Sequence, residues 1–143
     1  MVRLIWINDN IAISPAFRTD ELMNIKEMEI DAIIDVRSEY QDDADLIKRA
    51  GMEFFHVGID DRYMPTHEQL ESILKFVDPL LAQNRKILIH CQNGYGRSPL
   101  VAIAILVKYG MHVPDAVGLM EDRHPTVSFT PQQEKFIYSL ERV

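Results

Sequence analysis

Residues 86–110 read KILIHCQNGYGRSPLVAIAILVKYG, and three successive patterns in this stretch decide the fold. The apolar run at 86–90 is typical of a strand that is buried on both faces of a sheet. A short polar loop with two glycines follows, and Pro99 then stands where a helix accepts proline in its first turn. The stretch therefore predicts a central strand, a tight loop and an apolar helix that ends at Gly110.

The rest of the chain alternates between strand-like and helix-like segments. Two short β-branched runs, 4–7 and 11–14, are separated by Asn-Asp-Asn and predict a hairpin or paired edge strands. Further strands are expected at 32–36 and 52–59, and further helices at 19–28, 40–50, 66–81, 114–123 and from 130 onward. This alternation predicts an α/β fold with a central, mostly parallel sheet flanked by helices, in a single domain over residues 1–143.

Three of the expected helices carry a recognisable N-terminal cap. Thr19 is expected to cap the first helix, because a threonine hydroxyl accepts a hydrogen bond from an unpaired backbone N–H group. The stretches 66–69 (THEQ) and 130–133 (TPQQ) each have the Thr-x-x-Gln spacing of a capping box. These caps predict where the helices begin.

The composition narrows the classes of partner and compartment. The formal net charge of −7 argues against nucleic acid or an anionic membrane as the main partner, since both favour a surplus of Lys and Arg. The longest apolar run, 100–107, is too short to span a membrane, and the N-terminal residues lack the pattern of a signal peptide. Cys91 is the one cysteine and fits a reducing compartment. We expect a cytoplasmic protein whose oligomeric state is open and compatible with a monomer.

The loop after the central strand has the residues of an anion site. In open α/β sheets ligands bind outside the carboxyl ends of the strands, and this loop lies there. The start of the next helix supplies unpaired N–H groups and a positive dipole end. Gly94 and Gly96 permit the positive φ angles of a tight turn, and the planar fork of Arg97 suits two phosphate oxygens. Such surroundings favour a thiolate at Cys91, to which the Ser98 hydroxyl could donate.

A cysteine, an anion-binding loop and an arginine together favour attack of sulfur on phosphorus, followed by cleavage of the phosphocysteine by water. The alternative is that Cys91 fills space in the core, as free cysteines often do. The stretch from His90 to Ser98 resembles the H-C-x-x-G-x-x-R-[S/T] signature of cysteine-based protein tyrosine and dual-specificity phosphatases. The likeness extends from about Leu4 to Leu140 and is closest to the compact dual-specificity type, which includes small archaeal and bacterial phosphatases.

The resemblance implies the fold of that family and a reaction that needs no metal ion or other cofactor. Cys91 would be the nucleophile, and Ser98 would steady its sulfur as a leaving group. His90 would shape the loop through hydrogen bonds. The residues that would bind phosphate are Gln92, Asn93, Gly94, Tyr95, Gly96 and Arg97. The other four histidines, at 56, 67, 112 and 124, show no metal-ligand spacing.

The family also needs an acid that protonates the leaving oxygen, and it supplies an aspartate from a mobile loop about thirty residues before the cysteine. Residues 56–70 read HVGIDDRYMPTHEQL and resemble the D-x-x-x-P pattern of that loop. Counting back from Pro65 places the acid at Asp61, with Asp60 as the near alternative. Both could instead be solvated turn residues, which aspartate favours. The same group would act as the base in the second step.

Three further positions can be compared with the pattern of this family. Gln133 resembles a glutamine that places the hydrolytic water in long tyrosine phosphatases, although its capping role is a sufficient explanation. Arg37 follows a strand in the stretch DVRSE, and we expect it to brace a loop rather than bind a ligand. The Arg-Pro pair common before the last helix in this family is replaced here by His124-Pro125.

The sequence favours an aryl phosphate as substrate. The variable positions of the cysteine loop carry no basic side chain, which argues against multiply charged phosphoinositides. Phe55, Tyr63 and Tyr95 could stack on an aromatic ring. We therefore expect a phosphorylated protein as substrate, with hydrolysis of phosphotyrosine that can extend to phosphoserine and phosphothreonine. The alternatives are a phosphatase of lipids or small phosphomonoesters, a rhodanese-type sulfurtransferase, and a non-catalytic phosphoprotein-binding module.

Overall fold

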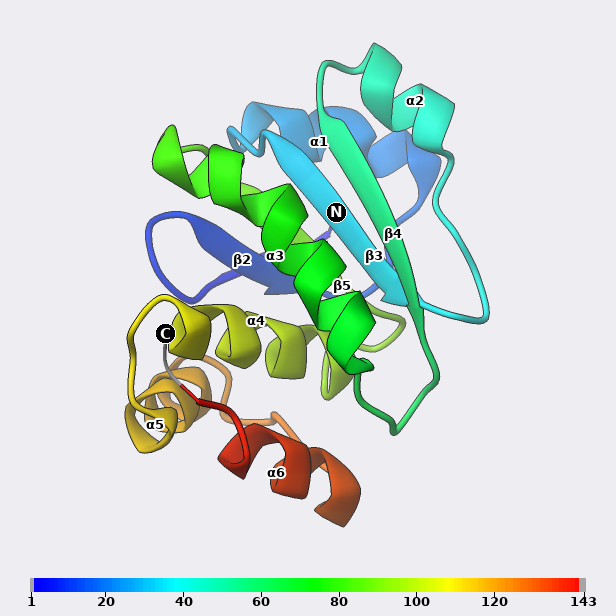
Figure 1. Ribbon diagram of the computed structural model, residues 1–143. Coiled ribbons are helices and arrows are strands. Elements are labelled where there is room, and N and C mark those ends of the chain that lie inside the picture. The colour runs from blue at the N-terminus through cyan, green and yellow to red at the C-terminus, as the bar shows by residue number, and fades with distance from the viewer. Residues whose placement is uncertain (1, 142–143) are drawn as a thin grey trace.

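The computed structural model describes residues 2–141 and has a five-stranded sheet at its centre, in the order β1-β2-β5-β3-β4 (Figure 1). The strands are β1 (Ile5–Trp6), β2 (Ile11–Ser14), β3 (Ala32–Arg37), β4 (Glu53–Ile59) and β5 (Ile87–His90). β1 pairs with β2 antiparallel, and the other pairings are parallel. The predicted hairpin, the mostly parallel sheet and the central place of the strand at 86–90 are thereby confirmed.

Helices cover both faces of the sheet (Figure 1). They are α1 (Leu22–Glu27), α2 (Ala44–Arg49), α3 (His67–Ala82), α4 (Arg97–Lys108), α5 (Val113–Arg123) and α6 (Pro131–Tyr138). Ile34 and Ile89 belong to the core formed with α3 to α6, whereas Ile33 and Leu88 belong to the core with α1 and α2. Successive strand residues point to opposite faces, so both layers require apolar side chains. Within residues 2–141, no helix is long and apolar enough to cross a membrane.

Two of the predicted helices begin differently. Thr19 does not cap the first helix: it starts a short 3₁₀ turn, Thr19–Glu21, and the Arg18 N–H donates to the Glu21 carboxylate at 2.9 Å. The helix expected from residue 40 begins only at Ala44, where the Asp43 side chain accepts from the Leu46 N–H at 3.1 Å. Residues 38–43 instead form a loop, because acidic side chains within it bind partners on β3, β5 and α4.

The parallel strands bring three loops to one edge of the sheet. Residues 38–43 follow β3, residues 60–65 follow β4, and residues 91–96 follow β5. The segment after β2 joins them, since the Ala16 N–H donates to the carbonyl oxygen of Gln92 at 3.0 Å. This edge is where an open α/β sheet places its ligand site.

Candidate active site

The Cys91 thiol lies directly after the central strand and is 3% exposed. The Gly94 N–H donates to its Sγ at 3.2 Å, and Ser98 Oγ, in the first turn of α4, lies 3.2 Å from the same sulfur. Cys91 lines a cavity of ≈ 390 Å³ together with parts of the loop 60–65, the loop 91–96 and the segment 128–133. The predicted contact between Ser98 and the sulfur is present.

The two loop glycines differ in their backbone conformation and in the space around them. Gly94 has φ +79°, and a Cβ there would lie 3.1 Å from the backbone nitrogen of Pro15, so both conformation and space favour glycine. Gly96 has φ −133°, which any residue can adopt, so the prediction of a positive φ there is wrong. A Cβ on Gly96 would instead lie 3.4 Å from the carbonyl oxygen of Ser128. The added Cβ would therefore make ordinary contacts with the segment 128–133, and neither φ nor space requires a glycine at this position.

Arg97 is buried, and the Nη1–Nη2 edge of its guanidinium group binds protein acceptors. Nη1 and Nη2 donate to the two carboxylate oxygens of Glu39 at 2.7 and 2.8 Å, and Nη1 also donates to the carbonyl oxygen of Ile59 at 2.9 Å. These bonds use three of the five guanidinium N–H groups and leave the Nε–H and one Nη2–H. Asp61 Oδ1 lies 3.8 Å from Nε, beside that remaining edge. The arrangement can bind two oxygens of a phosphate.

Glu39 is a site residue that sequence reasoning missed. Hydrogen bonds from Arg97 lower the pKa of its carboxyl group to about 2, so the pair is ionised throughout the neutral range. The sequence feature that could have identified Glu39 is its position two residues after β3, at the edge of the sheet where the cysteine loop also lies. Which carboxylate would meet Arg97 depended on the path of the loop 38–43, whose residues from 40 onward were predicted to be helical.

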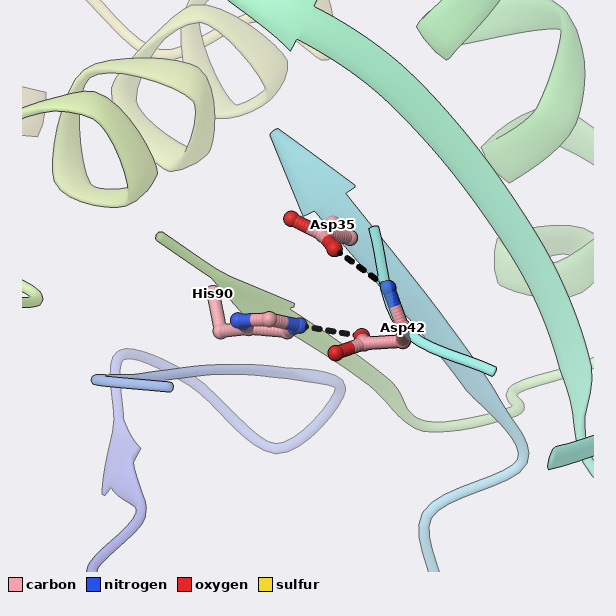
Figure 2. Close-up of side chains that lie close together, drawn as sticks. All are labelled: Asp35, Asp42 and His90. Carbon is pink, nitrogen blue, oxygen red and sulfur yellow. Dashed lines mark hydrogen bonds and ion pairs between the residues drawn. The ribbon is translucent and has the colours of Figure 1, made fainter. Parts of the chain in front are cut away.

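His90 and Arg37 support the first residues of the cysteine loop by hydrogen bonds. His90 is fully buried, and its Nε2 donates to Asp42 Oδ2 at 2.5 Å (Figure 2). Its Nδ1 lies 3.2 Å from the carbonyl oxygen of Cys91. Arg37 donates to Gln92 Oε1 at 2.9 Å and to Asp42 Oδ1 at 3.0 Å. Arg37 thus braces the loop as predicted, and His90 makes the hydrogen bonds expected of a residue that shapes it.

Asp35, Asp42 and His90 bring three potential metal-ligand atoms within 4.8 Å of one another (Figure 2). Arg37 already places its guanidinium against both carboxylates, at 3.0 Å from each. Burial alone would raise the pKa of Asp35, but hydrogen bonds from Arg37 and the charges of His90 and Arg37 together outweigh burial, so the pKa is lowered. We therefore assign this cluster as an ion-pair network that supports the loop, in which the arginine supplies the positive charge.

The structure separates the two candidate acids. Asp61 lines the cavity with Cys91, whereas Asp60 is not among the described residues that line it. The carbonyl oxygen of Asp60 accepts from the Tyr63 N–H at 3.0 Å, which forms a turn. The geometry therefore places Asp61, and not Asp60, on the cavity that Cys91 lines.

Gln133 forms the predicted capping box at the start of α6. Its Oε1 accepts from the Thr130 N–H at 2.9 Å, and its own N–H donates to Thr130 Oγ1 at 3.2 Å. Its Nε2 donates to the carbonyl oxygen of Tyr63 at 2.9 Å. The Gln133 side chain thus connects the first turn of α6 to the loop that carries Asp61. That this side chain places a hydrolytic water stays a prediction.

The aromatic residues of the cavity differ in part from those expected. Tyr95 lines the cavity, but Tyr63 does not, and Phe55 stacks on Phe76 with ring centroids 5.1 Å apart. Phe129, which sequence reasoning missed, lines the cavity from the segment before α6. An aromatic ring entering this cavity would meet Tyr95 and Phe129.

His124 contacts the cysteine loop on the side of Gly94. Its Nε2 donates to the carbonyl oxygen of Gly94 at 2.8 Å, and its ring lies nearly parallel to that of Tyr95 with centroids 6.1 Å apart. His124 is buried, with 6% exposure. The histidine that replaces the arginine of the family pattern therefore supports the loop directly.

Comparison with known proteins agrees with this geometry. The family model described as "Dual specificity phosphatase, catalytic domain" matches residues 16–143. Protein tyrosine phosphatase PRL-1 of Leishmania major is 33% identical over 90 residues, which are 57% of this chain and 51% of that protein. Dual specificity protein phosphatase 8 of Homo sapiens is 32% identical over 77 residues, 52% of this chain and 12% of that protein. The chain thus spans about half the length of the first relative and about an eighth of the second.

Solved structures give the same fold. Tk-PTP in its active form has a TM-score of 0.87 to this chain at 28% identity, over 96% of this chain and 95% of that one. PTPMT1 has a TM-score of 0.86 at 18% identity, over 96% of this chain and 93% of that one. At this low identity the likeness to PTPMT1 shows the fold alone. The predicted fold of the cysteine phosphatases is confirmed.

Proposed function

The chain belongs to the family of dual specificity phosphatase catalytic domains, and on this premise we propose that it hydrolyses phosphotyrosine in proteins through a phosphocysteine intermediate, with phosphoserine and phosphothreonine as further substrates. One observation carries the proposal. The buried sulfur of Cys91, the remaining edge of Arg97 and the carboxylate of Asp61 all border one cavity. These are the nucleophile, the anion binder and the proton donor that phosphoryl transfer to sulfur requires.

In the first step, Sγ of Cys91 attacks phosphorus in line with the ester oxygen. The S–P bond forms as the P–O bond to the leaving group breaks, and protonated Asp61 gives its proton to that oxygen. The Nε–H and the remaining Nη2–H of Arg97, together with backbone N–H groups of the loop, bind the non-bridging oxygens. The products of this step are the dephosphorylated alcohol or phenol, phosphocysteine and the Asp61 carboxylate.

In the second step, water attacks the phosphorus of the phosphocysteine. The Asp61 carboxylate takes one proton from this water, the P–S bond breaks, and the sulfur leaves as a thiolate. The Ser98 hydroxyl, 3.2 Å from Sγ, donates to the departing thiolate. Inorganic phosphate is released with the enzyme back in its starting protonation state, so atoms and charges balance.

The lining of the cavity supports an aryl phosphate as the substrate. Tyr95 and Phe129 offer aromatic surface, and the described cations on the cavity are Arg62 and Arg97. A phosphoinositide carries several phosphates. Besides the buried Arg97, only Arg62 among the described lining residues carries a positive charge that could bind the additional phosphates. A solved structure described as PTPMT1 in complex with PI(5)P has the same fold at 18% identity, so a lipid phosphate is an outcome that the test must include.

The test compares three substrates under the same conditions, with EDTA and a reductant present. We expect turnover of p-nitrophenyl phosphate and of a phosphotyrosine peptide, a lower rate with phosphatidylinositol 5-phosphate, and no turnover by Cys91→Ser. Preference for the lipid by kcat/KM would replace protein by lipid as the substrate class. Inactivity of the wild type at every pH from 5 to 8 would overturn the phosphatase proposal.

Two further assays identify the remaining alternatives if the wild type is inactive. Sulfur transfer from thiosulfate to cyanide would show a rhodanese-type reaction. Binding of phosphopeptides without turnover would show a recognition module. Turnover that depends on Cys91 rules out both as the main activity.

A further inference from the structure

The loop that carries Asp61 is held against the first turn of α6. Thr130 Oγ1 donates to the carbonyl oxygen of Arg62 at 3.1 Å, and Gln132 Nε2 donates to the same oxygen at 3.0 Å. These donors stand 68 and 70 residues later in the chain. Because Arg62 directly follows Asp61, the two bonds fix the backbone beside the carboxylate that lines the cavity.

A third bond comes from Gln133, which is 2% exposed and donates from Nε2 to the carbonyl oxygen of Tyr63 at 2.9 Å. Its Oε1 is occupied by the Thr130 N–H in the helix cap, and Thr130 Oγ1 accepts from the Gln133 N–H. The acceptor atoms of this capping box therefore cap α6, while its spare donors reach the loop 60–65. Cap and loop are held by the same two side chains.

The part of the loop that carries Asp61 has little apolar support, whereas Met64 packs on the core and Pro65 is buried. Residues 60–63 are exposed, so apolar burial does not fix them. Arg62 has φ 71°, in the left-handed region that is unfavourable for residues other than glycine. A backbone held in this conformation at an exposed site depends on its hydrogen bonds.

We propose that Thr130, Gln132 and Gln133 form a latch that positions Asp61 for proton transfer to the leaving oxygen. This inference rests on the proposed function, in which Asp61 is the general acid, and deepens it by assigning positioning residues on α6. The α6 latch is then most important for esters whose leaving group is a poor one, since these need the proton most.

The capping box of α3 provides a matched control. Gln69 has the same position in a Thr-x-x-Gln box, with Oε1 accepting from the Thr66 N–H at 2.9 Å. Its Nε2 also donates to a backbone carbonyl at 2.9 Å, but that carbonyl belongs to Gly58 in β4. Replacing Gln69 therefore removes the same kinds of bond without releasing the loop from α6.

The experiment measures kcat/KM for a phosphotyrosine peptide and for p-nitrophenyl phosphate. This parameter reports the steps up to departure of the leaving group, and p-nitrophenolate departs with less help from an acid. For the double variant Gln132→Ala/Gln133→Ala we expect a loss of about tenfold with the peptide and of less than about twofold with p-nitrophenyl phosphate. Gln69→Ala should keep the wild-type ratio of the two substrates.

The single variant Gln132→Ala keeps the proposal testable if the double variant is unstable. Gln132 is exposed and outside the capping pair, so its removal leaves the α6 cap intact. We expect a smaller change of the substrate ratio in the same direction, about twofold to fivefold. An unchanged ratio in both variants, or an equal loss with both substrates, would overturn the latch.

Asp61→Asn separates failure of the latch from failure of the proposed function. If Asp61→Asn changes the substrate ratio strongly but the α6 variants do not, Asp61 is the acid and the latch is wrong. If Asp61→Asn leaves the ratio unchanged, the assigned general acid is wrong and the latch falls with it. Wild-type inactivity would instead overturn the function.

Discussion

The cysteine loop and the loop that carries Asp61 border the same cavity but are held in different ways. The cysteine loop joins the buried strand β5 to the buried helix α4, and His90, Cys91 and Arg97 are each at most 3% exposed. Residues 60–63 are exposed, and side chains of α6 hold them by hydrogen bonds. The nucleophile and the anion site are therefore held by burial, whereas the acid is held by hydrogen bonds to its exposed loop.

The largest effect is expected from the sulfur itself. Cys91→Ser should lower turnover of p-nitrophenyl phosphate by at least about 1,000-fold, because an alcohol at this site is a far weaker nucleophile than a thiolate. The hydroxyl can keep the hydrogen bonds to Gly94 and Ser98, so the thermal midpoint should stay within a few degrees of wild type. A variant with residual activity near wild type would contradict the role of the cysteine loop.

The next effect tests the exposed loop. Asp61→Asn should lower kcat/KM for a phosphotyrosine peptide by about 100-fold and remove the basic limb of its pH profile, since an amide cannot donate the proton. Asp60→Asn, one residue earlier and outside the cavity, should change kcat/KM by less than about twofold. A large loss with Asp60→Asn and none with Asp61→Asn would reverse the assignment of the acid.

A smaller effect is expected when the ion pair between Arg97 and Glu39 is removed. Glu39→Gln should lower kcat/KM by about tenfold, because Arg97 loses a charge-assisted bidentate partner that orients it. The variant is compared with wild type at several pH values between 5 and 8.

The pH dependence of this pair follows from the direction of its shift. The pKa of Glu39 is lowered from 4.5 to about 2 in the folded protein, so the stabilisation is present above pH 4.5 and is lost as pH falls through 2. The ratio of wild-type to Glu39→Gln activity should therefore stay constant from pH 5 to 8. A ratio that changes across this range would show that another group controls Arg97.

A clear effect on stability is expected at the turn of the cysteine loop. Gly94→Ala should destabilise the protein by about 1–2 kcal/mol, because φ is +79° and the added Cβ would lie 3.1 Å from the nitrogen of Pro15. Thermal unfolding measures this loss. Gly96→Ala, with an ordinary φ and a nearest contact of 3.4 Å, should cost less. The reverse order would contradict the account of the turn.

The same contrast explains what the sequence could predict. Residues 90–98 are contiguous, and the structure brings His90, Cys91, Arg97 and Ser98 together because one strand-loop-helix unit determines their positions. Asp42 lies in the segment 40–50 that was predicted as helix, and Glu39 lies just before it. Their partners on α4 and β5 are more than forty residues away. Such contacts depend on strand order and loop path, which local patterns do not contain.

Some predictions were right in part, because long-range contacts determine what local sequence patterns leave open. The pattern D-x-x-x-P limited the acid to two neighbouring aspartates, and only the turn geometry places Asp61 at the cavity. The capping box at 130–133 was predicted from its spacing, but its spare donors reach Arg62 and Tyr63 through the tertiary fold. The prediction of a positive φ was right at Gly94 and wrong at Gly96, because residue types alone do not determine the φ of each loop residue.

The most direct test of the central claim is detection of phosphate on Cys91 during turnover. Enzyme reacting with p-nitrophenyl phosphate is mixed rapidly with denaturant, and the peptide containing Cys91 is analysed by mass spectrometry. We predict one phosphoryl group on Cys91 in the wild type and none on this peptide in Cys91→Ser. Steady turnover with no phosphorylated Cys91 at any mixing time, and with unimpaired activity of Cys91→Ser, would contradict the phosphocysteine mechanism.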